Sequence, residues 1–298
     1  QTLVEALPSD GLAILNYDDS RVLSMAARTK ARVKTFGRTG GDYIISNLRA
    51  DNPAGLTLSI SHDNETIDLK TQLTGAHQSV PIAAAFACAR ELGIPASVCQ
   101  ERIASFKPVF GRCSVHVIEN GPIFIADSVK APYHSVHHVI EMMTHFSAPR
   151  KRIVIGQISD ASNSRAKYRD IYRASRDVAD QVIYVGENSH RSKATAEDIA
   201  AGRFVEQHKV EDAASFVRDT AIPGELILLK SSVSLHLERI LLGFITDVRC
   251  WEGKCGKRAQ CVECGLYGLA FDEHPRWSPL KPWHLDEVRD PVSSNSIK

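Results

Sequence analysis

The sequence predicts an α/β protein with two domains and a small metal-binding tail, and three observations support this. Residues 12–73 contain several apolar or alternating segments of strand character, which indicates a mixed sheet. From residue 123 onward, short apolar strands alternate with helical segments, as is typical of a mostly parallel sheet covered on both faces. Four cysteines then fall between residues 250 and 264.

Length and composition limit the class of protein. The chain has 298 residues, 43% of them hydrophobic, a formal charge of +1 and a pI of about 7.8. Such a balanced charge gives no reason to expect a nucleic-acid partner. The sequence has no run of 18 apolar residues and no signal-peptide pattern, so we expect a cytoplasmic protein without membrane association. Cys88, Cys99 and Cys113 lie among apolar neighbours and are interpreted as buried thiols.

The first part of the chain is predicted to form most of the mixed sheet. Residues 1–7 are interpreted as the end of a helix. Asp18, Asp19 and Ser20 are suited to cap a helix over residues 21–29. Strands are expected at residues 12–16, 32–36, 42–47, 56–62 and 66–73. The last of these alternates apolar and polar residues, so one of its faces is expected to meet water.

Two helices should follow this sheet. The first has Pro81 in its first turn and Gly93 just past its end, which are favoured positions for these residues. Small alanine side chains between them would let this helix lie close to the sheet. The second is expected to begin at Ser97, with Gln100 three residues later completing a capping box.

Residues 106–132 are predicted to join the two domains. Pro108 fixes φ and Gly111 allows positive φ, so we expect a turn that places Arg112 between the domains. Two short strands are expected next, at residues 114–119 and 123–126. The second ends in a polar run that begins at Asp127. Polar residues just beyond the carboxyl end of a strand are where open α/β sheets bind ligands.

The second domain is predicted to be Rossmann-like. Helices are expected at about residues 133–146, 165–179, 195–200 and 210–219, and strands at 153–155, 181–185 and 225–229. Two loops, over residues 156–162 and 230–234, follow strands and should therefore lie at the ligand-binding edge of the sheet.

The cysteine spacing near the C-terminus, C-x4-C-x5-C-x2-C, indicates a metal site. Its members are Cys250, Cys255, Cys261 and Cys264. Four thiolates this close suit structural Zn²⁺, with an iron–sulfur cluster as the main alternative and disulfides less favoured in a cytoplasmic protein. Beyond them, Trp277 and Trp283 among several prolines predict an extended arm packed on a neighbouring surface. The last six residues are expected to be disordered.

The residues around the domain junction carry a family resemblance. F-x-P-V-x-G-R, a strand, an Asn-Gly turn, a strand ending in Asp and a Pro five residues later resemble the hinge of the Mur ligases and of the related folylpolyglutamate and cyanophycin synthetases. The resemblance implies that Arg112 reaches nucleotide phosphates and that Asp127 lies near the ribose. Lys130 stands where many members have His, which implies a nucleotide contact. An ordinary hinge salt bridge is the alternative role for Arg112.

Two segments upstream are also similar to the central domain of that family. A-x-L-N-x-D-D, followed by V-x-T-F-G, implies that Asn16 faces the nucleotide, and an Asx turn is the alternative. G-x-H at the start of an alanine-rich helix resembles the G-x-H-N-x-x-N-A segment, which implies a nucleotide contact for His77. Here the sequence departs from the family, because Gln78 and Pro81 occupy the asparagine positions.

The loops 156–162 and 230–234 resemble the G-x-M-x-E-L-G and K-G-S segments of the C-terminal domain of Mur ligases. In that family this domain closes over the nucleotide and presents the incoming amino acid or peptide. The resemblance therefore implies substrate-binding roles, carried by Asp160, Lys230, Ser231 and Ser232. A solvated lysine at a strand end is the alternative role for Lys230.

The resemblance implies three parts. Residues 1–111 would be the second half of a Mur-type central ATP-binding domain, residues 112–246 the C-terminal domain and residues 247–298 an added metal-binding tail with four cysteines. The sequence has no G-x-x-G-K-[ST] loop, so the phosphate cradle and most of the Mg²⁺ site are expected on a missing segment or a partner chain.

The activity that the resemblance implies is an ADP-forming ligase that joins a carboxylate to an amine and uses ATP and Mg²⁺. Arg112 and Lys130 would act as its catalytic residues on this chain. The alternative is a non-catalytic nucleotide-binding or scaffold protein derived from such a ligase.

Overall fold

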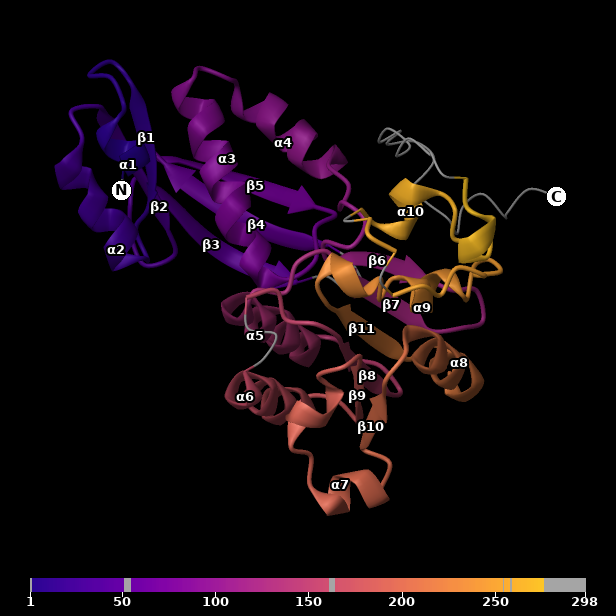
Figure 1. Cartoon of the computed structure of the whole chain (residues 1–298). Coiled ribbons are helices and arrows are strands. Elements are labelled where there is room, and N and C mark those ends of the chain that lie inside the picture. Colours follow the sequence, from indigo (N-terminus) through magenta and orange to yellow (C-terminus); the bar gives the residue numbers. More distant parts are fainter. Residues whose placement is uncertain (1, 51–54, 161–163, 254, 258, 276–298) are drawn as a thin grey trace. The chain divides into compact units, whose positions relative to one another are not determined.

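The computed structural model describes residues 2–50, 55–160, 164–253, 255–257 and 259–275. The chain, coloured along its sequence in Figure 1, divides into two compact units, residues 1–107 and 108–298. The described residues form a five-stranded sheet in the first unit and a six-stranded sheet in the second, and the two sheets share no strand. Each unit therefore has its own core.

The first unit is a mixed sheet with two helices. In chain order its elements are α1 (Thr2–Glu5), β1 (Leu12–Asn16), α2 (Ser20–Leu23), η1 (Ser24–Arg28), β2 (Arg32–Gly37), β3 (Tyr43–Ala50), β4 (Leu56–His62), β5 (Glu65–Thr71), η2 (Ala76–Gln78), α3 (Ser79–Glu91) and α4 (Ala96–Ser105). Strands β1, β2 and β3 pair in parallel, whereas β3, β4 and β5 pair antiparallel. Side chains of α3, such as Phe86, pack with Leu58 and Ile60 of the sheet.

Local sequence signals explain the start of one helix of this unit and misplace the start of another. Asp19 caps α2 by accepting hydrogen bonds from the backbone N–H groups of Arg21 and Val22, which confirms the predicted capping. The predicted capping box of α4 is wrong. The helix begins one residue earlier, with Pro95 as its N-cap, so Ser97 lies inside the first turn. The side chain of Gln100 donates instead to the carbonyl of Asp68 in β5.

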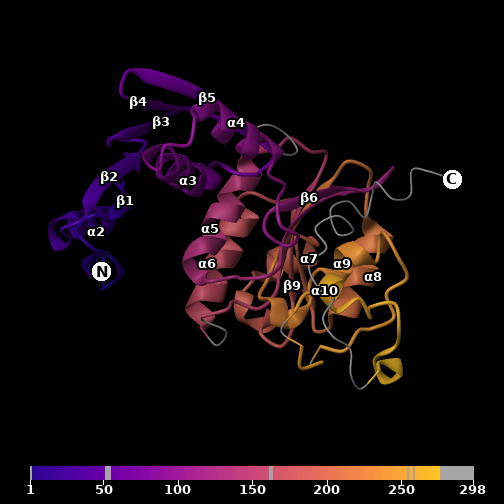
Figure 2. The same cartoon turned by 90° about the horizontal axis from the view of Figure 1, so that it is seen from above.

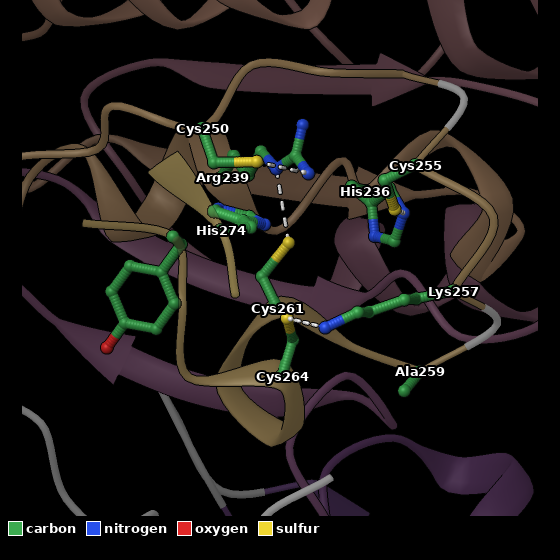
Figure 3. A pocket seen from close by; sticks show the side chains of 10 residues that line it. His236, Arg239, Cys250, Cys255, Lys257, Ala259, Cys261, Cys264 and His274 are labelled. Atoms are coloured by element: carbon green, nitrogen blue, oxygen red, sulfur yellow. Dashed lines mark hydrogen bonds between the residues drawn. The ribbon is translucent and has the colours of Figure 1, made fainter. Parts of the chain in front are cut away.

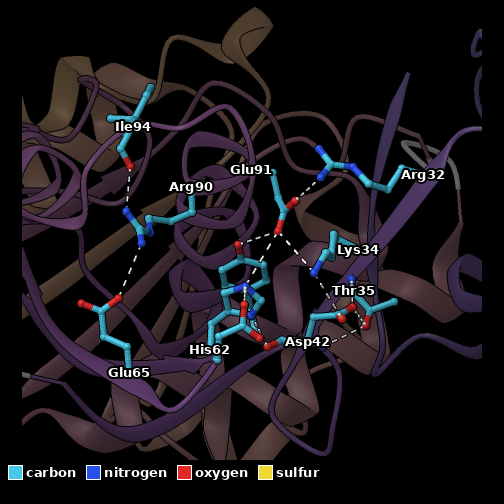
Figure 4. A network of polar contacts seen from close by, with 11 residues as sticks. Arg32, Lys34, Thr35, Asp42, His62, Glu65, Arg90, Glu91 and Ile94 are labelled. Atoms are coloured by element: carbon cyan, nitrogen blue, oxygen red, sulfur yellow. Dashed lines mark hydrogen bonds and ion pairs between the residues drawn. The ribbon is translucent and has the colours of Figure 1, made fainter. Parts of the chain in front are cut away.

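A buried carboxylate at the end of α3 ties this helix to the sheet (Figure 4). Glu91 lies 3.1 Å from Arg32 and 3.5 Å from Lys34, both on β2. It also accepts from the hydroxyl of Tyr43 in β3 over 2.9 Å and lies 3.9 Å from Nε2 of His62 in β4, whose ring stacks on that of Tyr43. Glu91 therefore links three strands to one helix.

The second unit is an α/β sheet with helices on both faces. In chain order its elements are β6 (Ser114–Val117), β7 (Ile123–Asp127), α5 (Tyr133–Met142), η3 (Met143–His145), β8 (Lys151–Ile155), α6 (Arg165–Arg176), β9 (Gln181–Val185), η4 (Ser189–Ser192), α7 (Ala196–Ala200), β10 (Phe204–Gln207), α8 (Val210–Thr220), β11 (Leu226–Lys230), η5 (Val233–Leu235), α9 (Arg239–Leu242), α10 (Cys261–Cys264) and η6 (Phe271–Glu273). The strand order is β10-β9-β8-β11-β7-β6, and all pairs are parallel except β6 with β7. This confirms the predicted mostly parallel sheet.

The two faces of this sheet carry separate helices, as Figures 1 and 2 show. Helices α5 and α6 pack on one face, where Ile140 and Tyr172 join a cluster with Ile153 and Leu228 of the sheet. Helices α8 and α9 pack on the other face, whose cluster includes Val217 and Ile240. The buried strands are therefore apolar on both sides, as the sequence indicated.

The sequence did not predict β10, whose four residues, Phe-Val-Glu-Gln, are too short and too polar at one end to stand out. The cysteine tail packs on the second unit through Trp251 and Val262. The predicted extended arm with Trp277 and Trp283 lies outside the described residues. No helix in the described part of the chain is long and apolar enough to cross a membrane.

Candidate functional site

Three neighbouring strands of the second unit end together and place polar residues at one edge of the sheet. Lys230, at the end of β11, is aligned with Asp127 of β7 on one side and with Ile155 of β8 on the other. The N–H of Gly156 donates to the carbonyl of Lys230 over 2.9 Å. A methyl group at Gly156 would lie only 2.4 Å from the hydroxyl oxygen of Ser231, so no side chain fits between these loops.

Asp127 and Lys230, 103 residues apart in sequence, form a buried ion pair at this edge. Their Oδ2 and Nζ atoms are 2.5 Å apart, and the side chains are 7% and 3% exposed. Nζ also donates to the carbonyl of Lys130 over 2.8 Å, so the pair holds the loop that follows β7. Losing either partner would leave the other charge buried and uncompensated. The structure thus brings together two residues for which the sequence implied separate roles.

The loops after β8 and β11 are joined by hydrogen bonds. The hydroxyl of Ser231, which is buried, accepts from the N–H of Gln157 over 3.1 Å, and the N–H of Ser232 donates to the carbonyl of Gln157. The side chain of Gln157 in turn accepts from Ser234 over 3.0 Å. Ser232 and Ser234 therefore present hydroxyl groups on a fixed backbone.

Asp160 is an exposed anion next to this edge. Its Oδ1 accepts from the N–H of Tyr133, at the start of α5, over 2.9 Å, and this bond lowers the pKa of Asp160 below its ordinary value. The carboxylate is therefore charged at neutral pH and directed toward the loop before α5. Such a group attracts an ammonium ion.

Two exposed cations accompany these residues. Arg112 follows a turn in which its N–H donates to the carbonyl of Val109 over 3.0 Å, and Gly111 has the positive φ of 73° that the sequence predicted for this turn. Lys130 is exposed just past the end of β7. Arg112 stands just before β6, whose first residue, Ser114, pairs with Ala126 near the end of β7. Cationic side chains open to solvent at this edge of the sheet fit the phosphates of a nucleotide. The buried Asp127 carboxylate, in contrast, is engaged by Lys230.

Asn16 and His77 are the residues of the first unit that were expected to contact nucleotide. They lie in separate segments, at the end of β1 and in η2. The Oδ1 of Asn16 accepts from the N–H of Asp18 over 3.0 Å, which is the Asx turn considered as an alternative. Burial acts to raise the pKa of Asp18, but hydrogen bonds from Arg38 and Thr39 outweigh it and lower the pKa. His77 lies in η2, half-buried, with Nε2 3.3 Å from Nε2 of Gln78.

The four tail cysteines line one pocket of the second unit (Figure 3). His236 and Arg239, which the sequence analysis did not single out, line it too. Among the described residues, the metal-ligating groups that approach within 4.8 Å of one another as a set of three are His236, Glu238 and Cys261. No such set lies at the strand-end residues described above, so these do not by themselves make a Mg²⁺ site within the described chain.

Comparison with known proteins agrees with this architecture. The family model "Mur ligase middle domain" matches residues 1–89, and the model "Mur ligase, glutamate ligase domain" matches residues 111–233. The two matches fall in the two units of the structure. Together they cover every described strand of both sheets, and residues 90–110 and 234–298 lie outside the two matches.

Curated relatives and solved structures point the same way. The chain is 26% identical over 228 residues to the UDP-N-acetylmuramoylalanine–D-glutamate ligase of Desulfitobacterium hafniense, which covers 74% of this chain and 47% of that protein. It is 25% identical over 254 residues to the UDP-N-acetylmuramate–L-alanine ligase of Desulforapulum autotrophicum, covering 76% and 52%. The chain thus spans about half the length of these relatives.

Among solved structures, the MurF ligase of Thermotoga maritima in complex with ADP has a TM-score of 0.69 at 20% identity, and the match covers 81% of this chain and 55% of that one. The corresponding ligase of Acinetobacter baumannii has a TM-score of 0.68 at 18% identity, covering 80% and 52%. These likenesses concern the fold. Combined with the matches to both domain models, they show that the chain belongs to the Mur ligase family.

Proposed function

We propose that this chain is part of an ATP-dependent, ADP-forming ligase that joins a carboxylate to the amine of an amino acid or peptide. Membership of the Mur ligase family supports the reaction class. The observation that carries the proposal is the edge of the second sheet, where β7, β8 and β11 end together beside exposed Arg112 and Lys130. The phosphate loop and most of the Mg²⁺ site would come from a segment or chain other than the one described.

ATP, when bound, would supply the phosphoryl group that activates the carboxylate. The work of this chain is then positioning and charge neutralisation. Arg112 and Lys130 would face the phosphates and offset their negative charge. Lys230 holds the Asp127 carboxylate and the Lys130 carbonyl, so it would set the direction of the loop that carries Lys130. Asp127 would approach the ribose only if this ion pair is shared with a ribose hydroxyl.

The incoming amine would be held at the loops after β8 and β11. Asp160 is ionised and exposed, and would attract the ammonium group of the free amino acid. The hydroxyl of Ser232 would donate to its carboxylate. The buried hydroxyl of Ser231, which donates to the Ser232 carbonyl and accepts from the N–H of Gln157, would hold the backbone of this substrate loop in place. Lys230 is already paired, so it would bind that carboxylate only through a rearrangement of the Asp127 contact.

The test is to tag the chain in its own organism and isolate it with its natural partners. ADP release would be measured with ATP, UDP-N-acetylmuramoyl acceptors and single amino acids. We expect release that depends on both acceptor and amine. Arg112→Ala should lower turnover by roughly 10²-fold or more, the usual loss on removing one electrostatic donor. Arg173→Ala, an exposed arginine at the far end of α6, is the matched control and should not change turnover.

The binding-protein alternative is separated by the same preparation. ATP binding, measured by calorimetry, with no ADP release for any acceptor and amine would favour a nucleotide-binding scaffold. The glutamine and proline at the family's asparagine positions, Gln78 and Pro81, motivate this alternative. A preparation that neither binds ATP nor releases ADP would contradict both.

A further inference from the structure

The cysteine tail and the segment after β11 enclose a buried pocket, seen from close by in Figure 3. Its cysteines and histidines are Cys250, Cys255, Cys261, Cys264, His236 and His274. The cavity volume is about 10 Å³, which is room for a single atom-sized occupant.

Polar atoms at this pocket lack partners within the described chain. The Nδ1 atom of His236 and the Oε2 atom of Glu238 are buried and make no hydrogen bond there, although these residues are only 2% and 0% exposed. Buried polar groups are nearly always satisfied, because a buried polar atom without a hydrogen-bond partner lowers stability. The donor atoms of His236 and Glu238 lie within 4.8 Å of each other and of the Cys261 sulfur. The unpartnered Nδ1 atom and the Glu238 carboxylate therefore fit an imidazole that holds an ion at its other nitrogen and donates from Nδ1 to the carboxylate.

Two cations donate to the cysteine sulfurs. Arg239, which is 1% exposed, directs Nε at the sulfur of Cys261 over 3.1 Å and a second nitrogen at Cys250 over 3.6 Å. Lys257 directs Nζ at Cys264 over 3.3 Å. Within the described chain, the guanidinium of Arg239 has no hydrogen bond to a carboxylate. A buried guanidinium requires nearby negative charge. The buried Glu238 carboxylate supplies part of it, and metal-bound thiolates would add to it.

The arrangement of His236 is that of a metal-bound imidazole. Its Nε2 atom lies 3.2 Å from the sulfur of Cys255, and its Nδ1 atom lies 3.6 Å from Oε1 of Glu238. Histidines that bind metal through one ring nitrogen usually direct the other at a carboxylate. Among the described groups, the set that lies within 4.8 Å of one another is His236, Glu238 and Cys261, so the other thiolates would approach the ion when it binds.

We propose that this pocket binds one Zn²⁺ ion through His236 Nε2 and three of the four tail thiolates. Glu238 orients the imidazole, and Arg239 and Lys257 offset the thiolate charge. The ion thereby joins the tail to the segment after β11. Of the two metals expected from the cysteine spacing, this arrangement favours zinc, and it replaces one cysteine ligand by a histidine that lies outside the motif.

The site adjoins the edge of the sheet on two sides. His236 follows Ser231 and Ser232 after the single turn of η5, and the N–H of Val233 in that turn donates to the carbonyl of Val129 over 3.0 Å. On the other side, the side chain of Gln260 packs on Gly111, where an added methyl group would lie 2.6 Å from its Oε1. Metal binding therefore fixes the backbone on which Arg112 and Ser232 stand.

The ligand set is tested on the full chain purified under reducing conditions without added metal. Elemental analysis should find one zinc per chain, without iron. X-ray absorption at the zinc edge should show one nitrogen at about 2.0–2.1 Å and three sulfurs at about 2.3 Å. A shell of four sulfurs would remove His236 from the site. Iron with sulfide, or cysteines paired as disulfides with no metal, would overturn the proposal entirely.

Variants give an independent measurement. His236→Gln should lower zinc retention against a chelator at least tenfold, whereas His208→Gln, an exposed histidine of the same unit, should not. The Cys→Ser series at the four tail positions should weaken zinc retention in three cases, and Cys88→Ser in α3 is its control. Equal retention by wild type and His236→Gln would contradict the assignment.

The effect of metal binding on the backbone at the edge of the sheet can be measured separately, without ligase activity. Hydrogen exchange of the wild-type chain should become faster in segments 108–114 and 229–238 when zinc is removed, and recover when Zn²⁺ is returned. Exchange in α6 should not change. Unchanged protection in both segments would show that the metal does not support the sheet edge, even if it binds as proposed.

Discussion

At the scale of single residues, the most informative contact is the ion pair of Asp127 and Lys230. It is almost completely buried and connects neighbouring strands at the point where the sheet meets its loops. A lysine at the end of an apolar strand looks solvated in the sequence. The strand register gives a different result, because it aligns Lys230 with Asp127, about a hundred positions earlier, and the two form a buried pair.

Replacing Lys230 by Met should destabilise the second unit by about 3–5 kcal/mol, since the Asp127 charge would stay buried without a partner. Chemical denaturation of the full chain, followed by a probe in that unit, measures this. The double variant Lys230→Met with Asp127→Asn should recover part of the loss. Lys209→Met, at an exposed lysine, is the control. A loss below about 1 kcal/mol would mean that the pair is solvated.

Asp198 provides a prediction about pH. Its pKa is lowered to about 2, first by the hydroxyl of Tyr172, which donates over 2.6 Å, and then by Arg203 over 2.8 Å. A carboxyl whose folded pKa is depressed stabilises the protein above its unfolded pKa of about 3.9, and this contribution disappears as pH falls toward 2.

Asp198→Asn should therefore cost about 1–3 kcal/mol at pH 7, the value of hydrogen bonds to a charged group. The difference in the free energy of unfolding between variant and wild type should disappear as the pH falls from about 4 to about 2. Thermal unfolding across this range is the measurement. A gap that stays constant with pH would show that the carboxylate charge contributes nothing.

At the scale of secondary-structure elements, the turn before β6 is the most constrained. Gly111 has positive φ, which costs other residues about 1–2 kcal/mol, and a methyl group would also meet Gln260. Gly111→Ala should thus lower the unfolding temperature of the second unit and weaken zinc retention. Gly243→Ala is the matched control, because its φ of −65° is helical and its nearest atoms are 3.4 Å away.

Another element-level prediction concerns α3 and its sheet. Glu91→Gln removes the charge that Arg32 and Lys34 share, so we expect a loss of about 1–3 kcal/mol in the first unit. Denaturation followed by a probe in residues 1–107 would detect it. Glu101→Gln, at an exposed glutamate of α4, should leave stability unchanged. Equal losses in both variants would contradict a specific role for Glu91.

The sequence anticipated most strands because their apolar runs are bounded by turn residues. Leu226–Lys230, flanked by Gly224 and serines, is such a run, and the cap at Asp19 was readable from composition. The start of α4 was misplaced, because Pro95 outweighs the Ser97 signal. β10 is too short to carry a pattern.

The candidate sites were harder to predict, since their members come from distant segments. His236 precedes the first tail cysteine by 14 positions, and Glu238 and Arg239 look like ordinary surface charges in the sequence. Their burial results from how the tail folds back on α9. Motif spacing identifies residues that lie close together in the sequence. His236, Glu238 and Arg239 join the site only through tertiary packing.

At the scale of the whole molecule, two units with separate sheets and cores should unfold separately. Calorimetry of the zinc-loaded chain should show two transitions. Chelation should lower only the one that belongs to the second unit, by roughly 5–10 °C if the metal contributes about 2–3 kcal/mol. A single cooperative transition, or an equal shift of both, would contradict this independence.

The position of β11 has a consequence for synthesis on the ribosome. Of the described strands it emerges last, yet it lies between β7 and β8, which have no direct pairing with each other. Until residue 230 leaves the exit tunnel, the nascent chain can hold only two separate ladders, β6 with β7 and β8 with β9 and β10. The second unit must therefore complete its sheet late in translation, by inserting its final strand into a gap that the earlier strands have kept open.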